Sequence, residues 1–233
     1  MKLLWQQISN CTITEILCNS KFDGVVFDLE HGCYNNETLY NCIQICNLKN
    51  KLCFIRVTYL DKTVIRMCLD AGCTGVIFST IEDFRQAEEA YNFCFYPPKG
   101  SRGQGLVREN KWGQEDFLLR SPIIVAQIET QRGLKNIDSI SQVNFDYYMI
   151  GPYDLSASLG CIGDFNSFLY NDAIKTLKSK LGDKLGYHIV KNIKDQFIKY
   201  KDSKFLALGM DTLFLTDGIN NINTIYDQRT TAE

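Results

Sequence analysis

Residues 122–130 read PIIVAQIET, and residues 145–160 read FDYYMIGPYDLSASLG. Each stretch begins with a short apolar run and reaches an acid as that run ends: Glu129 in the first and Asp154 in the second. Apolar runs this short, rich in Ile, Val and Tyr, are typical of parallel strands that are buried on both faces. This region therefore predicts two successive strands of an α/β fold, each followed by a carboxylate.

The position of the two carboxylates suggests a metal site. In α/β barrels the chemistry takes place at the carboxyl-terminal ends of the strands. Two carboxylates at that edge can share one divalent cation, and Mg²⁺ and Mn²⁺ both accept such oxygen ligands. Each acid could equally cap the following helix or pair with a neighbouring cation, and the spacing alone leaves both interpretations open.

Outward from this region, the chain alternates between apolar runs and amphipathic segments. The predicted strands are LLWQQ (3–7), GVVF (24–27), KLCFIRV (51–57), TGVIFST (74–80), IIVAQIE (123–129), YYMIG (147–151), KLGYHIV (184–190) and TLFLTDG (212–218). Helices are expected between them, the first capped by Thr12 or Thr14, and a brief last helix over 219–228. Eight such units without a break in composition predict one (β/α)₈ TIM barrel domain over residues 1–233. The alternative is a doubly wound sheet, but VVFDLEHG lacks the glycine-rich turn that such a sheet would have after its first strand.

Composition narrows the class of protein. The formal net charge is -2 with both signs spread along the chain, which gives no electrostatic reason to expect nucleic acid or an anionic membrane as a partner. No apolar run approaches the length of a spanning helix or a signal peptide, so we expect a soluble, cytoplasmic protein. The ten cysteines show no metal-binding spacing and are expected to be buried reduced thiols.

Two further segments interrupt the pattern. Residues 96–114, YPPKGSRGQGLVRENKWGQ, are predicted to form a long active-site loop because they combine prolines, glycines and cations. Arg102 in this loop could neutralise an anionic substrate or be a solvated charge. After Gly218 the chain is short and polar, and we expect little more than a tail there.

Polar residues at the predicted strand ends are the candidate site. They are Asp28, His31, Arg56, Gln127, Glu129 and Asp154. His31 could be a general base oriented by Asp28, although a lone histidine is more often structural. Arg56 is costly to bury without an anion, which could be a substrate, Asp70 or another internal acid. His188, flanked by apolar residues, is interpreted as structural.

An ordered set of motifs resembles the HpcH/HpaI aldolase family, which consists of metal-dependent class II aldolases of the phosphoenolpyruvate/pyruvate barrel superfamily. The matching motifs are FDGVVFDLEHG (22–32), FIRV (54–57), LDAGCTGVIF (69–78), YPPKGSRGQG (96–105), QIET (127–130) and IGPYDLSASLG (150–160). The resemblance is strong from about Phe22 to Gly163. Beyond that, LALGMDTLFLTDG (206–218) resembles the last strand of the family.

The resemblance implies a role for most of the candidate residues. Glu129 and Asp154 match the metal ligands, with Mg²⁺, Mn²⁺ or Co²⁺ as the cation. Gln127 matches a glutamine beside the bound oxo acid, and Arg56 the arginine that contacts the oxo oxygen and the developing enolate. His31 matches a histidine of proton transfer, with Asp28 as its orienting acid.

Further matches concern binding and assembly. The turn Gly151-Pro152-Tyr153-Asp154 matches the segment whose backbone amides hold the pyruvate carboxylate. Asp70 matches an acid that supports the arginine or lies near a subunit contact, and the family suggests a trimer or hexamer. Two departures, Tyr153 before the ligand aspartate and Ser79 in place of a proline, concern the size of the substrate.

The implied reaction is reversible cleavage of a 4-hydroxy-2-oxo acid, such as a 2-keto-3-deoxy sugar acid, to pyruvate and an aldehyde through a metal-stabilised enolate. No strand-end lysine is required, which argues against a Schiff-base mechanism. Two alternatives remain: a lyase acting on acyl-CoA, like the citrate lyase β-subunit, and a non-catalytic barrel that binds 2-oxo acids. The sequence does not identify the aldehyde.

Overall fold

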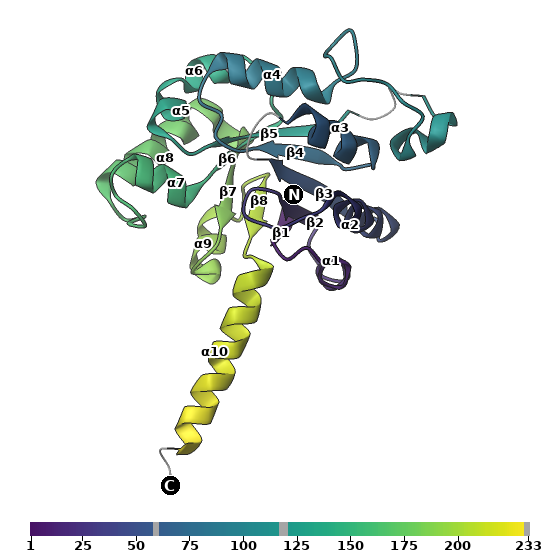
Figure 1. Ribbon diagram of the computed structural model, residues 1–233. Helices are drawn as coiled ribbons and strands as arrows, with labels where there is room; N and C mark the ends of the chain where they lie inside the picture. Colours follow the sequence, from purple (N-terminus) through teal and green to yellow (C-terminus); the bar gives the residue numbers. More distant parts are fainter. Residues whose placement is uncertain (58–60, 117–120, 231–233) are drawn as a thin grey trace.

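Eight parallel strands close into a barrel in the computed structural model, which describes residues 1–57, 61–116 and 121–230 (Figure 1). The strands follow one another around the barrel in chain order, and β8 pairs with β1. Their bounds are β1 Lys2–Gln6, β2 Gly24–Asp28, β3 Leu52–Val57, β4 Gly75–Phe78, β5 Ile123–Ile128, β6 Tyr147–Ile150, β7 Leu185–Ile189 and β8 Leu206–Leu208. The predicted (β/α)₈ barrel is confirmed.

Helices connect the strands and surround the barrel. They are α1 Cys11–Cys18, α2 Asn36–Leu48, α3 Lys62–Asp70, α4 Phe84–Cys94, η1 Arg108–Gly113, α5 Gln131–Lys135, α6 Ile137–Ile140, α7 Pro152–Ser158, α8 Phe168–Leu181, η2 Gly182–Lys184, α9 Ile193–Tyr200 and α10 Asp211–Thr230. The cap of α1 is Asn10, whose side chain accepts from two backbone N–H groups, so the prediction of Thr12 or Thr14 was wrong. Asn10 is the N-cap because its backbone is extended and it directly precedes the first turn of the helix.

Alternation along the strands gives the barrel two apolar layers. One side of the strands fills the barrel interior with bulky side chains such as Trp5, Phe54 and Phe205. The other side packs against the helices, where most of the buried cysteines lie. Strands buried on both faces leave polar positions mainly at their ends, and this is what concentrates the chemistry there.

The end of the chain differs from the prediction. The segment TLFLTDG (212–218) is helical rather than a strand, and β8 is the preceding Leu206–Leu208. Gly209, at φ +60°, ends the strand, and the carboxylate of Asp211 accepts the backbone N–H groups of Gln7 and Ile8, each at 2.9 Å. These contacts fix the start of α10, which continues through the expected polar tail to Thr230 and projects away from the barrel (Figure 1).

Among the helices of the described residues, none has both the length and the apolarity to cross a membrane.

Candidate active site

The carboxyl-terminal half of the barrel interior is lined by polar and aromatic side chains. The inward positions of β1, β3, β5 and β7 supply Trp5, Arg56, Gln127 and His188. The Trp5 and His188 rings stack with centroids 4.1 Å apart, and the Arg56 guanidinium lies 5.0 Å from the Trp5 ring centroid. In barrels of this kind, alternate strands contribute the side chains of one layer. Because this layer lies toward the carboxyl-terminal ends of the strands, it forms the floor of a site at the barrel mouth.

Arg56 is bound by two acids from the end of β2. Its Nε and Nη2 donate to Asp28 at 2.9 and 2.7 Å, and its Nη1 lies 2.7 Å from Glu30. Asp28 and Arg56 face one another because their strands pair in that register. Asp70 does not support Arg56 within this chain, since it is the last residue of α3 and binds Arg102. The alternative that Asp70 lies near a subunit contact stays a prediction.

Asp28 organises the loop that carries His31, but not through the histidine ring. Its side-chain oxygens also accept from Trp5 Nε1 and Gln7 Nε2, each at 3.1 Å, and from the backbone N–H of His31 at 3.2 Å. Burial opposes ionisation of Asp28, but the charge and hydrogen bonds of Arg56 outweigh it and hold the pKa below its ordinary value. Asp28 therefore orients Arg56 and the backbone of His31, whose side chain is exposed at the mouth.

Glu129 is an acid at this mouth whose pKa is raised by its surroundings. It is buried and accepts a hydrogen bond from Thr80 Oγ1 at 2.6 Å and another from Gln127 Nε2. Burial raises the pKa of Glu129 to about 7, with Glu30 and Asp154 adding to the rise against Thr80 and Arg56. Thr80 holds a left-handed φ of +54°, which is uncommon for a residue other than glycine and tends to cluster at functional sites.

The turn after β6 completes the arrangement. Gly151 precedes α7, and a Cβ at this position would lie 2.3 Å from Glu129 Oε2 and 2.5 Å from Gln127 Nε2. Only glycine leaves the space that these two side chains occupy. Pro152 and Tyr153 begin α7, and Asp154 stands in its first turn with its side chain exposed.

These residues have the donor chemistry of a divalent-cation site. Glu129 and Asp154 offer hard carboxylate oxygens and repel each other's charge, which a cation between them would relieve. Gln127 adds a buried Oε1 that lacks a hydrogen-bond partner. Within the described ranges no group of three or more His, Cys, Asp or Glu side chains could hold a metal, so the protein would provide two ligands and leave the rest of the coordination open.

The long loop lies elsewhere. Residues 96–114 join α4 to β5, so they enter at the amino-terminal edge of the barrel, opposite the carboxylates. There Arg102 is buried against Asp70 and Glu109, with its guanidinium 4.5 Å from the Tyr96 ring centroid. Arg102 is therefore neither a solvated charge nor a group at this mouth, and an active-site role of the loop stays a prediction that would involve another chain.

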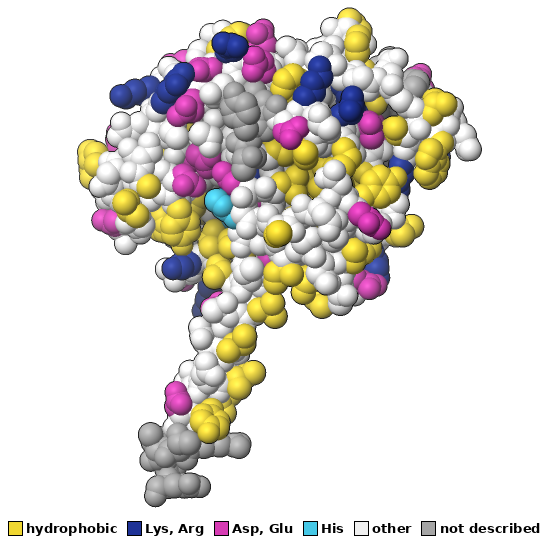
Figure 2. Space-filling model, in the orientation of Figure 1, with side chains coloured by type: hydrophobic (Ala, Val, Ile, Leu, Met, Phe, Trp, Pro, Cys, Tyr) yellow, Lys and Arg dark blue, Asp and Glu magenta, His cyan; other side chains and the backbone are white. Residues whose placement is uncertain are grey.

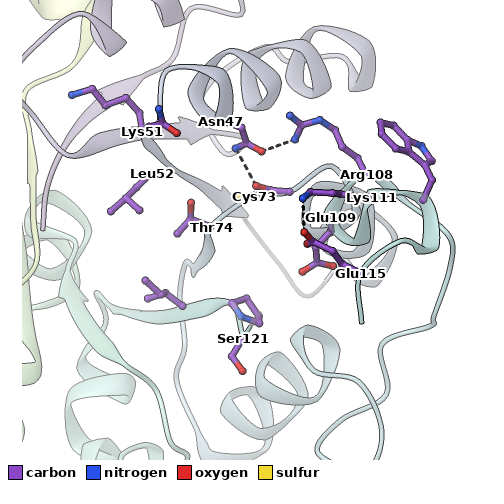
Figure 3. Close-up of a pocket in the computed structure, with 15 residues that line it drawn as sticks. Asn47, Lys51, Leu52, Cys73, Thr74, Arg108, Glu109, Lys111, Glu115 and Ser121 are labelled. Carbon is purple, nitrogen blue, oxygen red and sulfur yellow. Dashed lines mark hydrogen bonds and ion pairs between the residues drawn. The ribbon is translucent and has the colours of Figure 1, made fainter. Parts of the chain in front are cut away.

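A cavity of about 940 Å³ also opens at the amino-terminal edge (Figure 3). Its cations already have partners. Arg108 donates to Asn47 and to the backbone oxygen of Ala71, Lys51 donates to two backbone oxygens, and Lys111 pairs with Glu115. This cavity is distant from the strand ends and carries no comparable chemistry.

Sequence reasoning found most of the polar residues of the mouth and missed several that hold them. The missed residues are Trp5, Gln7, Glu30 and Thr80. His188, which was interpreted as structural, stacks on Trp5. All five lie at or within a few residues of a strand end, which was a usable signal. The two residues that depart from the family pattern make ordinary contacts. Ser79 donates to the backbone oxygen of Val57 at 2.7 Å, and the ring of Tyr153 packs edge-on against Phe165 with ring centroids 5.3 Å apart.

Comparison with known proteins finds related sequences over most of the chain. Residues 2–178 match the model of the HpcH/HpaI aldolase/citrate lyase family. A hydroxypyruvate/pyruvate aldolase of Roseobacter denitrificans is 30% identical over 221 residues, covering 91% of this chain and 86% of that protein. A 2-keto-3-deoxy-L-rhamnonate aldolase of Klebsiella pneumoniae is 27% identical over 228 residues, covering 93% and 85%.

Solved structures agree with the fold. A family protein of Burkholderia cenocepacia superposes with a TM-score of 0.88 at 21% identity, covering 97% of this chain and 94% of that one. A citrate synthase superposes with a TM-score of 0.85 at 22% identity, covering 98% and 94%. At these identities the two structures support the barrel alone.

Proposed function

The chain belongs to the HpcH/HpaI aldolase/citrate lyase family, and from this premise we propose that it is a divalent-metal-dependent class II aldolase. It cleaves a 4-hydroxy-2-oxo acid reversibly to pyruvate and an aldehyde. The two similar aldolases are named for pyruvate chemistry and for a 2-keto-3-deoxy sugar acid, which supports a substrate of this type.

The proposal rests on three groups that meet at one mouth of the barrel. They are the guanidinium of Arg56, the carboxyl group of Glu129 with its raised pKa, and the Oε1 of Gln127, which has no hydrogen-bond partner. Arg56 is held by Asp28 and Glu30, so its position is set before a substrate arrives. Preorganised donors of this kind stabilise charge that develops in a transition state. Glu129 and Gln127 lie within the same space, and Gly151 keeps it open.

In the cleavage direction, a base removes the proton from the C4 hydroxyl of the substrate. His31, exposed at the mouth, or a water molecule that it activates, is the proposed base. The C3–C4 bond breaks, its electron pair moves to C3 and the 2-oxo group, and an aldehyde leaves. Arg56 stabilises the resulting enolate of pyruvate, and a proton added at C3 completes the product.

Glu129 and Asp154 are the proposed ligands of the cation, which would be Mg²⁺, Mn²⁺ or Co²⁺. When bound, such an ion would supply Lewis-acid polarisation of the oxo group. Gln127 and the backbone of Gly151 to Tyr153 are proposed to orient the 2-oxo acid.

Exchange of the methyl protons of pyruvate with deuterated water tests this function without knowledge of the aldehyde. We expect exchange, followed by NMR, that requires added Mg²⁺ or Mn²⁺ and is lost in Glu129→Gln. Glu88→Gln, on the exposed side of α4, is the matched control and should exchange like the wild type. Absence of exchange with every metal would refute the pyruvate aldolase and favour the acyl-CoA lyase or the non-catalytic barrel.

We also propose that the chain forms a homo-oligomer through α10. Four apolar residues follow one face of this helix at spacings of four, three and four, and they are 51 to 68% exposed: Leu215, Ile219, Ile222 and Tyr226. Figure 2 shows apolar side chains along this projecting helix. An apolar row of this length that is left largely exposed is suited to a second copy. Light scattering of the full chain should give a multiple of the 26.7 kDa monomer, and a monomeric mass would refute it.

The cytoplasm remains the proposed location. All ten cysteines are free thiols in the structure, and most are buried, as expected for a reducing compartment. Thiol counting on protein isolated from its native cells would test this, and native disulfides would contradict it.

A further inference from the structure

Two pairs of cysteine thiols lie between α1 and α2, the neighbouring helices that follow β1 and β2 (Figure 1). The sulfur atoms of Cys11 and Cys42 are 3.9 Å apart, and those of Cys18 and Cys46 are 3.6 Å apart. Each pair takes one cysteine from each helix, so each could join α1 to α2 by a covalent bond. All four residues are free thiols in the structure.

The two pairs differ in their access to solvent. Cys18, Cys42 and Cys46 are buried, whereas Cys11, the first residue of α1, is partly exposed. The susceptibility of a thiol to oxidation rises with its exposure. A small oxidant can therefore reach Cys11 directly, while the Cys18–Cys46 pair is reached only when the two helices separate. The buried pair thus provides an internal comparison for the accessible one.

Cys42 is suited to the second step of an oxidation and not to the first. Burial raises the pKa of the Cys42 thiol above its ordinary value, so Cys42 keeps its proton at neutral pH. Oxidation of cysteine begins from the thiolate form. Cys11 is therefore the residue oxidised first, and Cys42 is the thiol that lies beside the oxidised sulfur.

Other thiols of the described residues lack this combination of access and a partner. Cys33 is exposed and Cys161 is partly exposed, but neither sulfur contacts another cysteine within the described ranges. Cys73 is buried and donates to the backbone oxygen of Cys53 at 3.0 Å. Buried thiols that only fill space are common in protein cores, and Cys11 differs from them because it is both accessible and paired.

We propose that Cys11 and Cys42 form a site of reversible oxidative modification, which closes to a disulfide when the protein meets a peroxide. The Cys11 thiolate attacks one oxygen of hydrogen peroxide and the O–O bond breaks. Cys11 becomes a sulfenic acid, and the hydroxide that leaves takes up the proton that Cys11 has released. The Cys42 sulfur then attacks the Cys11 sulfur, the S–O bond breaks, and the hydroxyl group leaves as water with the proton of Cys42. Two thiols are oxidised to one disulfide, and one peroxide is reduced to two water molecules.

The geometry requires a small movement. A disulfide bond is about 2.05 Å long, so the two sulfur atoms must approach one another by about 1.9 Å. Cys11 stands at the start of an eight-residue helix, and Cys42 lies in the middle of the longer α2. We therefore expect the start of α1 to move. In a reducing compartment the pair is a dithiol at rest, and exchange with other thiols restores it after oxidation.

The bond would act on the barrel mouth through the segment before Cys11. Gln7 donates to Asp28 at 3.1 Å, and the side chain of Gln6 donates to the backbone oxygen of Asn10 at 3.0 Å. A shift of Cys11 toward α2 therefore displaces the segment that holds Gln7 against Asp28. This consequence rests on the proposed aldolase function, whereas formation of the disulfide does not.

The test treats the reduced full chain with hydrogen peroxide and maps its peptides by mass spectrometry. We expect a pair of peptides joined through Cys11 and Cys42, lighter by two hydrogen atoms than the separate peptides and released by dithiothreitol. The link should form on the order of tenfold faster than any link between Cys18 and Cys46, because that pair is buried.

Variants separate a reactive pair from two thiols that only pack together. Cys11→Ser should abolish the link and leave Cys42 reduced. Cys42→Ala should also abolish it, but Cys11 should then stop at the sulfenic acid, which dimedone captures. Cys33→Ser is the matched control, since Cys33 is exposed and has no cysteine beside it among the described residues, and it should form the link at the wild-type rate.

Three results would overturn the inference: no oxidation of Cys11, oxidation of Cys11 without a bond to Cys42, or a Cys18–Cys46 link that forms first. Pyruvate exchange is the second readout. It should slow severalfold in the oxidised wild type, recover with dithiothreitol, and stay unchanged when Cys11→Ser is treated with peroxide. A link without this loss would refute the effect on the mouth. No exchange in the reduced protein would refute the aldolase and leave the disulfide site standing.

Discussion

The barrel holds a buried arginine near each of its two ends, and the two have nearly the same immediate surroundings. Arg56, at the carboxyl-terminal end, binds Asp28 and Glu30 and lies over Trp5. Arg102, at the amino-terminal end, binds Asp70 and Glu109 and lies over Tyr96. Each guanidinium thus meets two carboxylates and one aromatic ring.

The difference lies in what surrounds each group. Around Arg102 the acids belong to α3 and to the same loop, and they fasten that loop to the barrel, although the buried Nε of Arg102 has no hydrogen-bond partner. Around Arg56 there is a further acid, Glu129, with a pKa raised to about 7, and an unpaired oxygen of Gln127. A buried ion pair with an unpaired atom is therefore not in itself a sign of function; what distinguishes the surroundings of Arg56 is the additional acid Glu129 with its raised pKa.

Removal of Arg102, the cation at the amino-terminal end, should have the largest effect, and the effect is on stability. Arg102→Met leaves Asp70 and Glu109 without their partner, and breaking a buried pair in this way costs about 3–5 kcal/mol of unfolding free energy. Urea unfolding would measure it. Arg66→Met, an exposed arginine of α3, is the control and should change stability by no more than about 0.5 kcal/mol. Equal losses in the two variants would break the comparison.

At the carboxyl-terminal end, a change of Arg56 should reduce the rate of the proposed reaction. Arg56→Lys keeps the charge but loses the planar fork that spans Asp28 and Glu30, so the remaining cation is no longer fixed toward the substrate. We expect metal-dependent pyruvate exchange to fall about 10²–10³-fold, as for loss of one preorganised donor. Arg85→Lys, on the surface of α4, should exchange normally. A rate for Arg56→Lys within threefold of the wild type would show that the arginine only holds the fold.

The smallest effect concerns pH. Burial, and then the charge of Arg56, lower the pKa of His188 to about 4, whereas an unfolded histidine titrates near 6.5. Between these values the unfolded chain binds more protons, so stability falls as pH falls through this window, and above pH 6.5 the group contributes nothing. The shift corresponds to at most about 3 kcal/mol.

His188→Gln should therefore lose less unfolding free energy than the wild type between pH 7.5 and 4.5, as measured by urea unfolding at each pH. His31→Gln, with its exposed side chain, is the control. An identical loss in wild type and His188→Gln would show that Arg56 and Trp5 do not keep this ring neutral.

Much of the barrel could be predicted because its strands are buried on both faces and read as plain apolar runs. Strand β8 could not, because three residues carry too little pattern, and the apolar TLFL that follows suits a strand or a helix equally. The helix is favoured by the contacts of Asp211 at its start, and the partners of Asp211, Gln7 and Ile8, are more than two hundred residues away in sequence. Contacts of that range leave no local signal.

The candidate site shows the same division. Strand ends located Asp28, Arg56, Gln127 and Glu129, since position along a strand is local information. The pairing of Asp28 with Arg56 depends on the register between β2 and β3, and the burial of Arg102 on how a loop folds back against α3. Neither can be read from spacing, so the sequence did not predict that Asp28 binds Arg56 or that Arg102 is buried.

The contact between Asp211 and Gln7 has a consequence beyond closing the barrel. Gln7 donates to Asp28, and Asp28 fixes Arg56, so the first residue of α10 is joined to the reacting end of the barrel through two side chains. If a second copy holds α10 and thereby changes these contacts, self-association and pyruvate binding are thermodynamically linked, and such a coupling is reciprocal. Whatever pyruvate adds to the dissociation free energy of the assembly, assembly adds to the affinity for pyruvate.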